Sequence, residues 1–217
     1  AVPRQTDVTV DDAVFFAAME KQKAQGRAAG KFKMDKALDY SGAGNTFVGY
    51  EQLQQTAKVL AVYVDGTSVE AIKQGQNGVV VLDTTPFYAE SGGQVGDRGT
   101  IRCLSGEIKV SDTVFALPGL RKHVGVLSGE ITVGVEVTAA IDVDLRNATR
   151  KNHTATHILH YALRKVLGDH VKQAGSLVSA ERLRFDFSHY APLSAIEIEQ
   201  IERIANAQVL TNSDVKN

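Results

Sequence analysis

Residues 150–163, with the sequence RKNHTATHILHYAL, carry histidines at positions 153, 157 and 160 in an otherwise apolar run. Spacings of four and three residues place all three imidazoles on one face of a helix. The surrounding residues 145–168 have an apolar stripe at helical spacing, and Gly168 is suited to ending a helix. The sequence therefore predicts a long amphipathic helix that presents three histidines along one side.

Upstream of this helix, residues 47–143 have a different pattern of short β-branched runs separated by Gly, Asp and Asn turns. Six runs at fairly regular spacing predict a small antiparallel β-barrel. They are residues 58–64, 78–85, 99–103, 106–117, 122–129 and 135–143. Residues 9–29 have helical periodicity, with Thr9 and Asp12 as a capping box, and a glycine-rich linker follows them.

Downstream of the histidine helix, residues 170–178 and 182–189 have strand patterns, and residues 194–210 form another predicted helix. Ser194 and Glu197 are spaced as the cap of that helix. The fold class is therefore α+β: an N-terminal helical segment, a small antiparallel β-barrel, and a second α+β portion. We place the domain boundaries at 1–42, 43–145 and 146–217.

Composition narrows the class of protein. The 217 residues are 43% hydrophobic and 23% charged, which is ordinary for a globular chain. We find neither an apolar stretch of about 20 residues, the length that crosses a bilayer, nor a signal-peptide pattern. Cys103 is the only cysteine, which excludes an internal disulfide framework and fits a reducing cytosol.

The charges are unevenly distributed along the chain. Residues 1–145 carry 14 Lys and Arg against 18 Asp and Glu, whereas residues 146–189 carry 8 against 3. The histidine helix thus lies within the one basic segment, which favours a phosphate-bearing partner. A solvated surface of mixed charge remains the alternative interpretation.

His153 and His157 are candidate metal ligands, because two histidines four residues apart on a helix can chelate one ion. Thr154 follows His153 where a metalloprotease motif has glutamate, which argues against a metal-dependent peptidase. A zinc site needs three or four ligands and this pair supplies two, so a purely structural pair stays possible. We expect His160 to pack against the core and His123 to lie in a solvated barrel loop.

A second constellation lies in residues 83–101, with the sequence DTTPFYAESGGQVGDRGTI. Its glycines predict a flexible loop that approaches other backbone closely. It lacks the GxxxxGK[ST] order of a nucleotide-binding P-loop, so it provides no ATP site by itself. Its polar residues are nonetheless numerous for a structural hairpin, namely Glu90, Ser91, Gln94 and Asp97.

Taken together and in this order, residues 85–101, 150–178 and 182–189 closely resemble the editing region of the bacterial alanyl-tRNA synthetase family. The resemblance covers essentially the whole chain and is strongest over residues 85–189. It implies a β-barrel followed by an α/β editing domain of the threonyl/alanyl-tRNA synthetase type. It also implies a hydrolase that removes serine or glycine wrongly esterified to the tRNA for alanine, since an alanine pocket cannot strongly exclude either amino acid.

The resemblance assigns His153 and His157 to the HxxxH zinc pair of that family. The other two family ligands come from a downstream Cys-x-x-x-His motif, which this chain lacks, since Cys103 lies in the barrel region. We therefore expect a chain truncated at its C-terminus, in which zinc is bound weakly or not at all. ATP and Mg²⁺ would be cofactors of the parent synthetase and would not bind here.

The resemblance also assigns the candidate catalytic residues. Thr156 matches a pocket residue that would discriminate between amino-acid side chains. Gln173 matches one that would hydrogen-bond the substrate or the attacking water. Gln94 and Asp97 would border the same cleft.

The expected partner is the acceptor end of the tRNA for alanine, with Arg150, Lys151 and Arg184 facing its phosphates. The missing synthetase domains would be partners in cis, and we expect neither DNA nor a membrane as a partner. The implied location is the cytoplasm. Two other interpretations stay open: a free-standing trans-editing deacylase and a non-catalytic tRNA-binding module.

Overall fold

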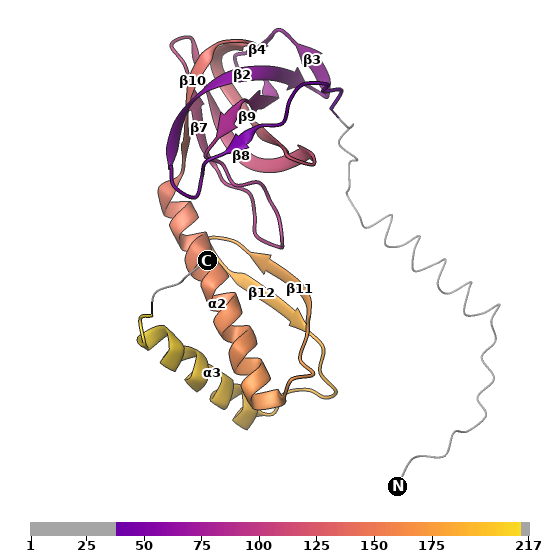
Figure 1. Cartoon of the computed structure of the whole chain (residues 1–217), viewed down its shortest axis with the longest axis vertical. Coiled ribbons are helices and arrows are strands. Elements are labelled where there is room, and N and C mark those ends of the chain that lie inside the picture. The colour runs from indigo at the N-terminus through magenta and orange to yellow at the C-terminus, as the bar shows by residue number, and fades with distance from the viewer. Residues whose placement is uncertain (1–37, 214–217) are drawn as a thin grey trace, which may run out of the picture. The chain divides into compact units, whose positions relative to one another are not determined.

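A computed structural model describes residues 38–213, which contain two helices and many short strands (Figure 1). This confirms the α+β class. The helix predicted at residues 9–29 lies outside the described residues. The domain boundaries placed at 42/43 and 145/146 stay predictions.

Six antiparallel strands form a closed barrel, and they correspond to the six predicted runs. They pair in the order β10-β7-β8-β9-β5-β2, and β10 pairs with β2 to close the ring. Closure leaves these strands without an unpaired edge. The strands are β2 (Gln54–Val64), β5 (Asn77–Leu82), β7 (Gly99–Arg102), β8 (Gly106–Leu117), β9 (Leu120–Thr132) and β10 (Glu136–Ile141).

Four short strands extend the barrel. β1 (Thr46–Phe47) pairs in parallel with β6 (Thr84–Thr85), while β3 (Thr67–Val69) pairs with β2 and β4 (Ala71–Lys73) with β9. Alternate side chains of the barrel strands point inward because successive residues of a strand face opposite sides. The fully buried interior includes Val62, Ile72, Val80, Leu82, Phe87, Ile101, Ile108 and Ile131.

His123 belongs to this buried interior, so the expectation of a solvated loop was wrong. It lies on β9 with no exposed surface. Its Nδ1 is 2.9 Å from the carbonyl oxygen of Val80, which can only accept, so Nδ1 carries the hydrogen. Its Nε2 then accepts the hydroxyl hydrogen of Thr85 at 2.8 Å. The pKa of His123 is lowered to about 4, mainly because the buried interior disfavours an imidazolium and in smaller part because of the charge of Arg121.

This burial predicts a specific pH dependence of stability. The unfolded chain binds a proton at His123 near pH 6.5, whereas the folded protein binds it only near pH 4. The free energy of unfolding therefore falls by up to about 3 kcal/mol as pH drops through this window, and it is regained as pH rises. Urea denaturation of the wild type and of His123→Asn at pH 7, 5.5 and 4 measures the effect. Identical slopes in the two proteins would contradict it.

The residues after the barrel form a helix, a hairpin and a second helix: α2 (Val143–Leu167), β11 (Gln173–Val178), β12 (Leu183–Phe187) and α3 (Ala195–Leu210). Asp142 caps the start of α2 by accepting a hydrogen bond from the Leu145 amide at 3.0 Å. Gly168 ends the helix as predicted, with a φ of 112°. Ser194 and Glu197 form the predicted capping box of α3.

One apolar cluster joins these elements. Both helices and the hairpin contribute to it, and Figure 1 shows α2 next to each of the other elements. Its fully buried members are Ala162, Leu163, Val171 and Ile201. The rings of Phe185 and Phe187 pack against it from β12, as their alternation with polar residues predicts. The apolar side of α2 is therefore packed in this cluster, whereas its polar side is not part of it.

A buried ion pair connects α2 to the barrel. The Nε of Arg146 donates to both carboxylate oxygens of Asp97 at 2.8 and 3.0 Å, and its Nη2 donates to the same carboxylate. The guanidinium also donates to the carbonyl oxygens of Gly49 at 2.8 Å and Pro86 at 3.0 Å. The amide of Tyr88 donates to Asp97 at 2.7 Å. Both charges are thus nearly fully hydrogen-bonded, as buried charges need to be.

Removing one partner is expected to be costly. Arg146→Met leaves the Asp97 carboxylate buried without its counter-charge, which lowers the free energy of unfolding by about 3–5 kcal/mol. Chemical denaturation measures this loss. Arg150→Met, one helical turn later on the exposed side of α2, serves as control and changes stability by no more than about 0.5 kcal/mol. Equal effects of the two substitutions would contradict the assignment.

Candidate functional site

The glycine-rich loop between β6 and β7 is fastened at its base and at its tip. At the base, Asp97 and Tyr88 exchange a backbone hydrogen bond of 2.9 Å in addition to the carboxylate contact. At the tip, Ser91 and Gln94 form a tight turn. Backbone hydrogen bonds of 2.7 and 3.0 Å then join the loop to Val178 at the end of β11. The loop therefore links the barrel to the hairpin beside α2.

Gly93 makes this close approach possible. Its φ is +85°, and a Cβ on it would lie 2.5 Å from the carbonyl oxygen of Ser176. A residue without a side chain is therefore required where the loop meets β11. The close approach fits the sequence prediction for these glycines.

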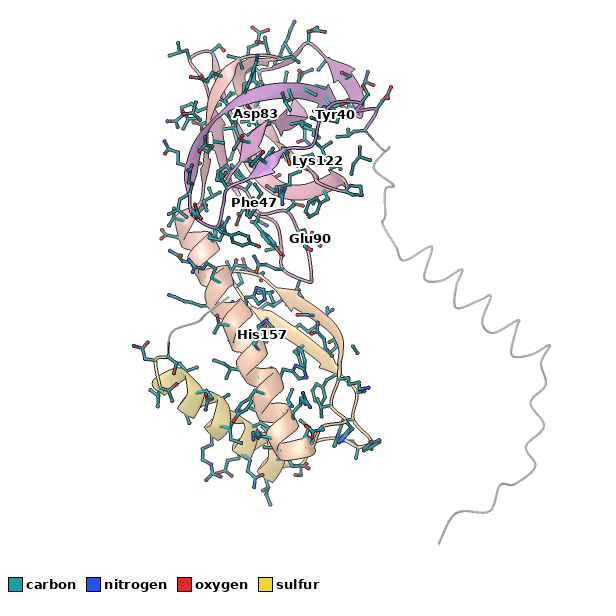
Figure 2. All side chains as sticks on the ribbon, in the orientation of Figure 1. Tyr40, Phe47, Asp83, Glu90, Lys122 and His157 are labelled. Atoms are coloured by element: carbon teal, nitrogen blue, oxygen red, sulfur yellow. The ribbon has the colours of Figure 1, made fainter. Side chains whose placement is uncertain are left out.

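The loop and the histidine helix meet at Gln94 and His153. Oε1 of Gln94 lies 2.5 Å from Nδ1 of His153, and the Gln94 side chain is buried. With the amide oxygen as acceptor, Nδ1 carries the hydrogen and the lone pair of Nε2 is free. The rings of His153 and His157 stack with centroids 5.2 Å apart and planes at 16°. Figure 2 labels His157 on the helix. Burial lowers the pKa of His153, and the neighbouring His157 lowers it further.

The two predicted metal ligands, His153 and His157, lie next to each other on α2. Among residues 38–213 there is no group of three or more His, Cys, Asp or Glu side chains that could hold an ion. The Gln94 contact is nonetheless the kind of outer hydrogen bond that orients a metal-binding imidazole. The pair is therefore suited to half of a tetrahedral site.

Thr156 lies between the two histidines in sequence and is nearly fully buried. Its hydroxyl donates to the carbonyl oxygen of Asn152 at 2.8 Å, one helical turn earlier, so its lone pairs remain able to accept. The side chain of Asn152 donates to the carbonyl oxygens of Ser179 at 2.8 Å and Ala180 at 3.3 Å. Sequence reasoning did not identify Asn152, which joins α2 to the turn after β11.

Gln173 and Asp97 lie apart from the Gln94–His153 contact. Gln173 is exposed at the start of β11, beside a bulge, whereas Val178 at the other end of this strand meets the loop. A strand of this length spans about 17 Å between those ends. Asp97 is buried in the ion pair with Arg146, whose role had no distinguishing signal in the sequence.

The three predicted basic contact residues are all exposed. Arg150 and Lys151 are on α2, and Arg184 is on β12, where its Nε lies 3.1 Å from Asp186. Further along α2 an open hollow of about 400 Å³ begins at His157. Its lining is His157, His160, Tyr161, Arg164, Lys165 and Asp169. His160 packs against Phe185 with ring centroids 5.0 Å apart, as its place beside the core predicts.

Comparison with known proteins identifies the family. Residues 1–145 match the tRNA synthetases class II (A). The chain belongs to this family. It is 58% identical over 214 residues to the alanine–tRNA ligase of Acidovorax sp. (strain JS42). The matched region is 98% of this chain and 24% of that protein. It is 55% identical over 216 residues to the alanine–tRNA ligase of Herminiimonas arsenicoxydans, covering 99% of this chain and 25% of that protein.

The chain thus spans about a quarter of the length of these class II relatives. The family match ends at residue 145, within the first turn of α2, so the histidines lie beyond it. The similarity to the alanine–tRNA ligases continues through the histidine helix, because it covers nearly all residues. In the described part of the chain, neither helix combines the length and apolar character that a membrane span requires.

Two adjacent glycines provide a matched test of the loop attachment. Both Gly92 and Gly93 have positive φ, but a Cβ on Gly92 would meet nothing within 4 Å. Gly92→Ala should cost about 1–2 kcal/mol of backbone strain, whereas Gly93→Ala should also push the loop off β11 and break the Gln94–His153 contact. Unfolding free energies and the NMR signal of the His153 imidazole measure both effects. An unchanged His153 signal in Gly93→Ala would contradict the attachment.

Proposed function

We propose that the chain is the editing portion of an alanine–tRNA ligase and hydrolyses seryl- or glycyl-tRNA for alanine. The observation that carries this proposal is the contact between Gln94 and His153, which brings the glycine-rich loop to the histidine pair. Two segments 59 residues apart, both noted for their polar residues, thereby meet at one point. Membership of the synthetase family and similarity to alanine–tRNA ligases supply the substrate class.

His153 and His157 would be two of the ligands of a zinc ion in this site, with the remaining ligands supplied from beyond the described residues. When bound, such an ion polarises a water or the ester carbonyl. Gln94 orients His153, because its amide oxygen holds the Nδ1 hydrogen and so directs Nε2 away from the loop. ATP and Mg²⁺ belong, in this proposal, to the aminoacylation site of the longer ligase.

Hydrolysis requires water to attack the ester carbonyl and the ribose hydroxyl to leave with a proton. The Gln94–His153 pair holds one imidazole in a fixed tautomer at the place where the loop meets the helix. Gln173 is proposed to hydrogen-bond the substrate or the attacking water, which requires the bound substrate to extend along β11, because Gln173 lies at the end of this strand away from the loop. Asp97 acts as a positioning residue, since its carboxylate is engaged by Arg146 and Tyr88 and fixes the base of the loop.

Thr156 is proposed to recognise the amino-acid side chain. Its hydroxyl hydrogen is engaged by Asn152, so the oxygen is left to accept a hydrogen bond from the hydroxyl of a misacylated serine. A site that hydrogen-bonds a hydroxyl rejects a substrate lacking it far better than an apolar pocket rejects an added hydroxyl. Seryl-tRNA would thereby be preferred over alanyl-tRNA, whereas hydrolysis of glycyl-tRNA would not depend on this contact.

The acceptor end of the tRNA would run past the exposed Arg150, Lys151 and Arg184. The partner domains in cis would be the rest of the ligase, and the location would be the cytoplasm. Neither DNA nor a membrane is part of the proposal.

The test is hydrolysis of seryl-tRNA for alanine, with added zinc, by this chain and by the ligase of full length. Gln94→Ala should lower the hydrolysis rate about 10- to 100-fold in whichever protein is active, because it frees the His153 ring. Thr156→Val should reduce the preference for seryl- over glycyl-tRNA. Thr154→Val, on the same helix and only partly buried, is the matched control and should leave both quantities unchanged.

Two outcomes separate the remaining interpretations. Cleavage by the full-length protein alone would support the editing assignment and place the other zinc ligands outside this chain. Failure of both proteins to cleave, with tRNA binding retained, would overturn the hydrolase assignment in favour of a non-catalytic tRNA-binding module.

A further inference from the structure

Arg121 on β9 is held by its main chain close to Asn45. Its amide donates to Oδ1 of Asn45 at 3.0 Å, and Nδ2 of Asn45 donates to the Arg121 carbonyl oxygen at 2.7 Å. Asn45 is itself buried. These two reciprocal hydrogen bonds fix the main-chain position of Arg121 near β1.

The guanidinium of Arg121 lies over two aromatic rings. Its central carbon is 4.6 Å from the ring centroid of Phe47 and 5.1 Å from that of Phe115. Two such cation–π contacts restrict the orientation of the planar group.

The Nε of Arg121 is fully buried and has no hydrogen-bond partner in the part of the chain described. By contrast, Arg146 has Asp97 and Arg102 has Glu107 as carboxylate partners. Burial lowers the pKa of Arg121, and the nearby hydroxyls of Tyr50 and Tyr88 partly oppose this. An oriented cation with a buried, unused donor is a feature that a native fold retains for a reason.

An exposed aromatic residue adjoins Phe47. Tyr50 is 81% exposed, and its ring meets that of Phe47 edge-on, with centroids 5.0 Å apart and planes at 81°. Tyr88 lies 6.3 Å from Phe47 by ring centroid and begins the glycine-rich loop, on which Figure 2 labels Glu90. A cation and a stacking surface are thus found together beside the loop that reaches His153.

We propose that Arg121 binds a phosphate of an RNA backbone and that Tyr50 stacks on a neighbouring base. A guanidinium fork matches a phosphate in both charge and geometry. An exposed tyrosine next to a fixed cation is the combination that binds single-stranded nucleic acid without base specificity. This assignment rests on the proposed function, which supplies the RNA, and extends its footprint from α2 and β12 onto the barrel.

Binding of this chain to an RNA hairpin that copies the acceptor stem and its single-stranded end tests the proposal, measured over a range of salt concentrations. Arg121→Met keeps the packing against the rings and removes the charge. The slope of log K against log salt should then become shallower by about 0.7–0.9. Arg102→Met removes a barrel arginine already paired with Glu107 and should leave the slope unchanged. Tyr50→Ala should weaken binding at least about fivefold with no change in slope.

Thermal melting of the same variants distinguishes binding from a structural role. The melting temperature of Arg121→Met should be unchanged or higher, because a buried donor without a partner is removed. A lower melting temperature with an unchanged salt slope would overturn the proposal in favour of a structural cation–π contact. Arg121-dependent binding of inorganic phosphate, or of an acidic peptide, without a change in the RNA slope would also overturn it. The binding measurement does not require catalysis, so it tests this proposal even if the chain does not hydrolyse seryl-tRNA.

Discussion

The buried ion pair between Arg146 and Asp97 sets the geometry of the rest of the molecule. Arg146 lies in the first turn of α2 and Asp97 at the end of the glycine-rich loop, so one contact fixes both elements to the barrel. The same guanidinium also engages the carbonyl oxygens of Gly49 and Pro86. A buried charge tolerates little displacement, because each hydrogen bond that is lost leaves part of the charge unsolvated, which costs free energy. The position of the histidines further along α2 therefore depends on this ion pair.

The position of the glycine-rich loop depends on the ion pair at its base and on its hydrogen bonds to β11 at its tip. Because Gly93 has no side chain, the loop backbone can reach Val178, and the neighbouring Gln94 then reaches His153. The loop is thus hydrogen-bonded on both sides of the point where it contacts the helix, although its glycines suggest flexibility. Rigid support of a polar contact is what an imidazole needs if it is to keep one tautomer and one direction.

Two arginines illustrate how burial divides structural from binding roles. Arg146 hydrogen-bonds to the Asp97 carboxylate and to two carbonyl oxygens within the fold. Arg121 lies over two aromatic rings, and its buried Nε lacks an acceptor among the described residues. Both arginines look alike in the sequence, and composition alone favoured a different set of basic residues as phosphate contacts. The difference between them is one of surroundings, which residues distant in the chain provide.

Local pattern determined the elements of this protein, while tertiary structure decided what the side chains do. Alternation predicted the six barrel strands, and apolar periodicity with caps predicted α2 and α3, because these signals come from neighbours along the chain. The burial of His123 was missed, since the Val80 carbonyl and Thr85 hydroxyl that satisfy it lie 43 and 38 residues away. The partner of Asp97 lies 49 residues on, and that of Gln94 lies 59 residues on. Packing between elements distant in the chain brings such residues together, and no local spacing encodes which of them will meet.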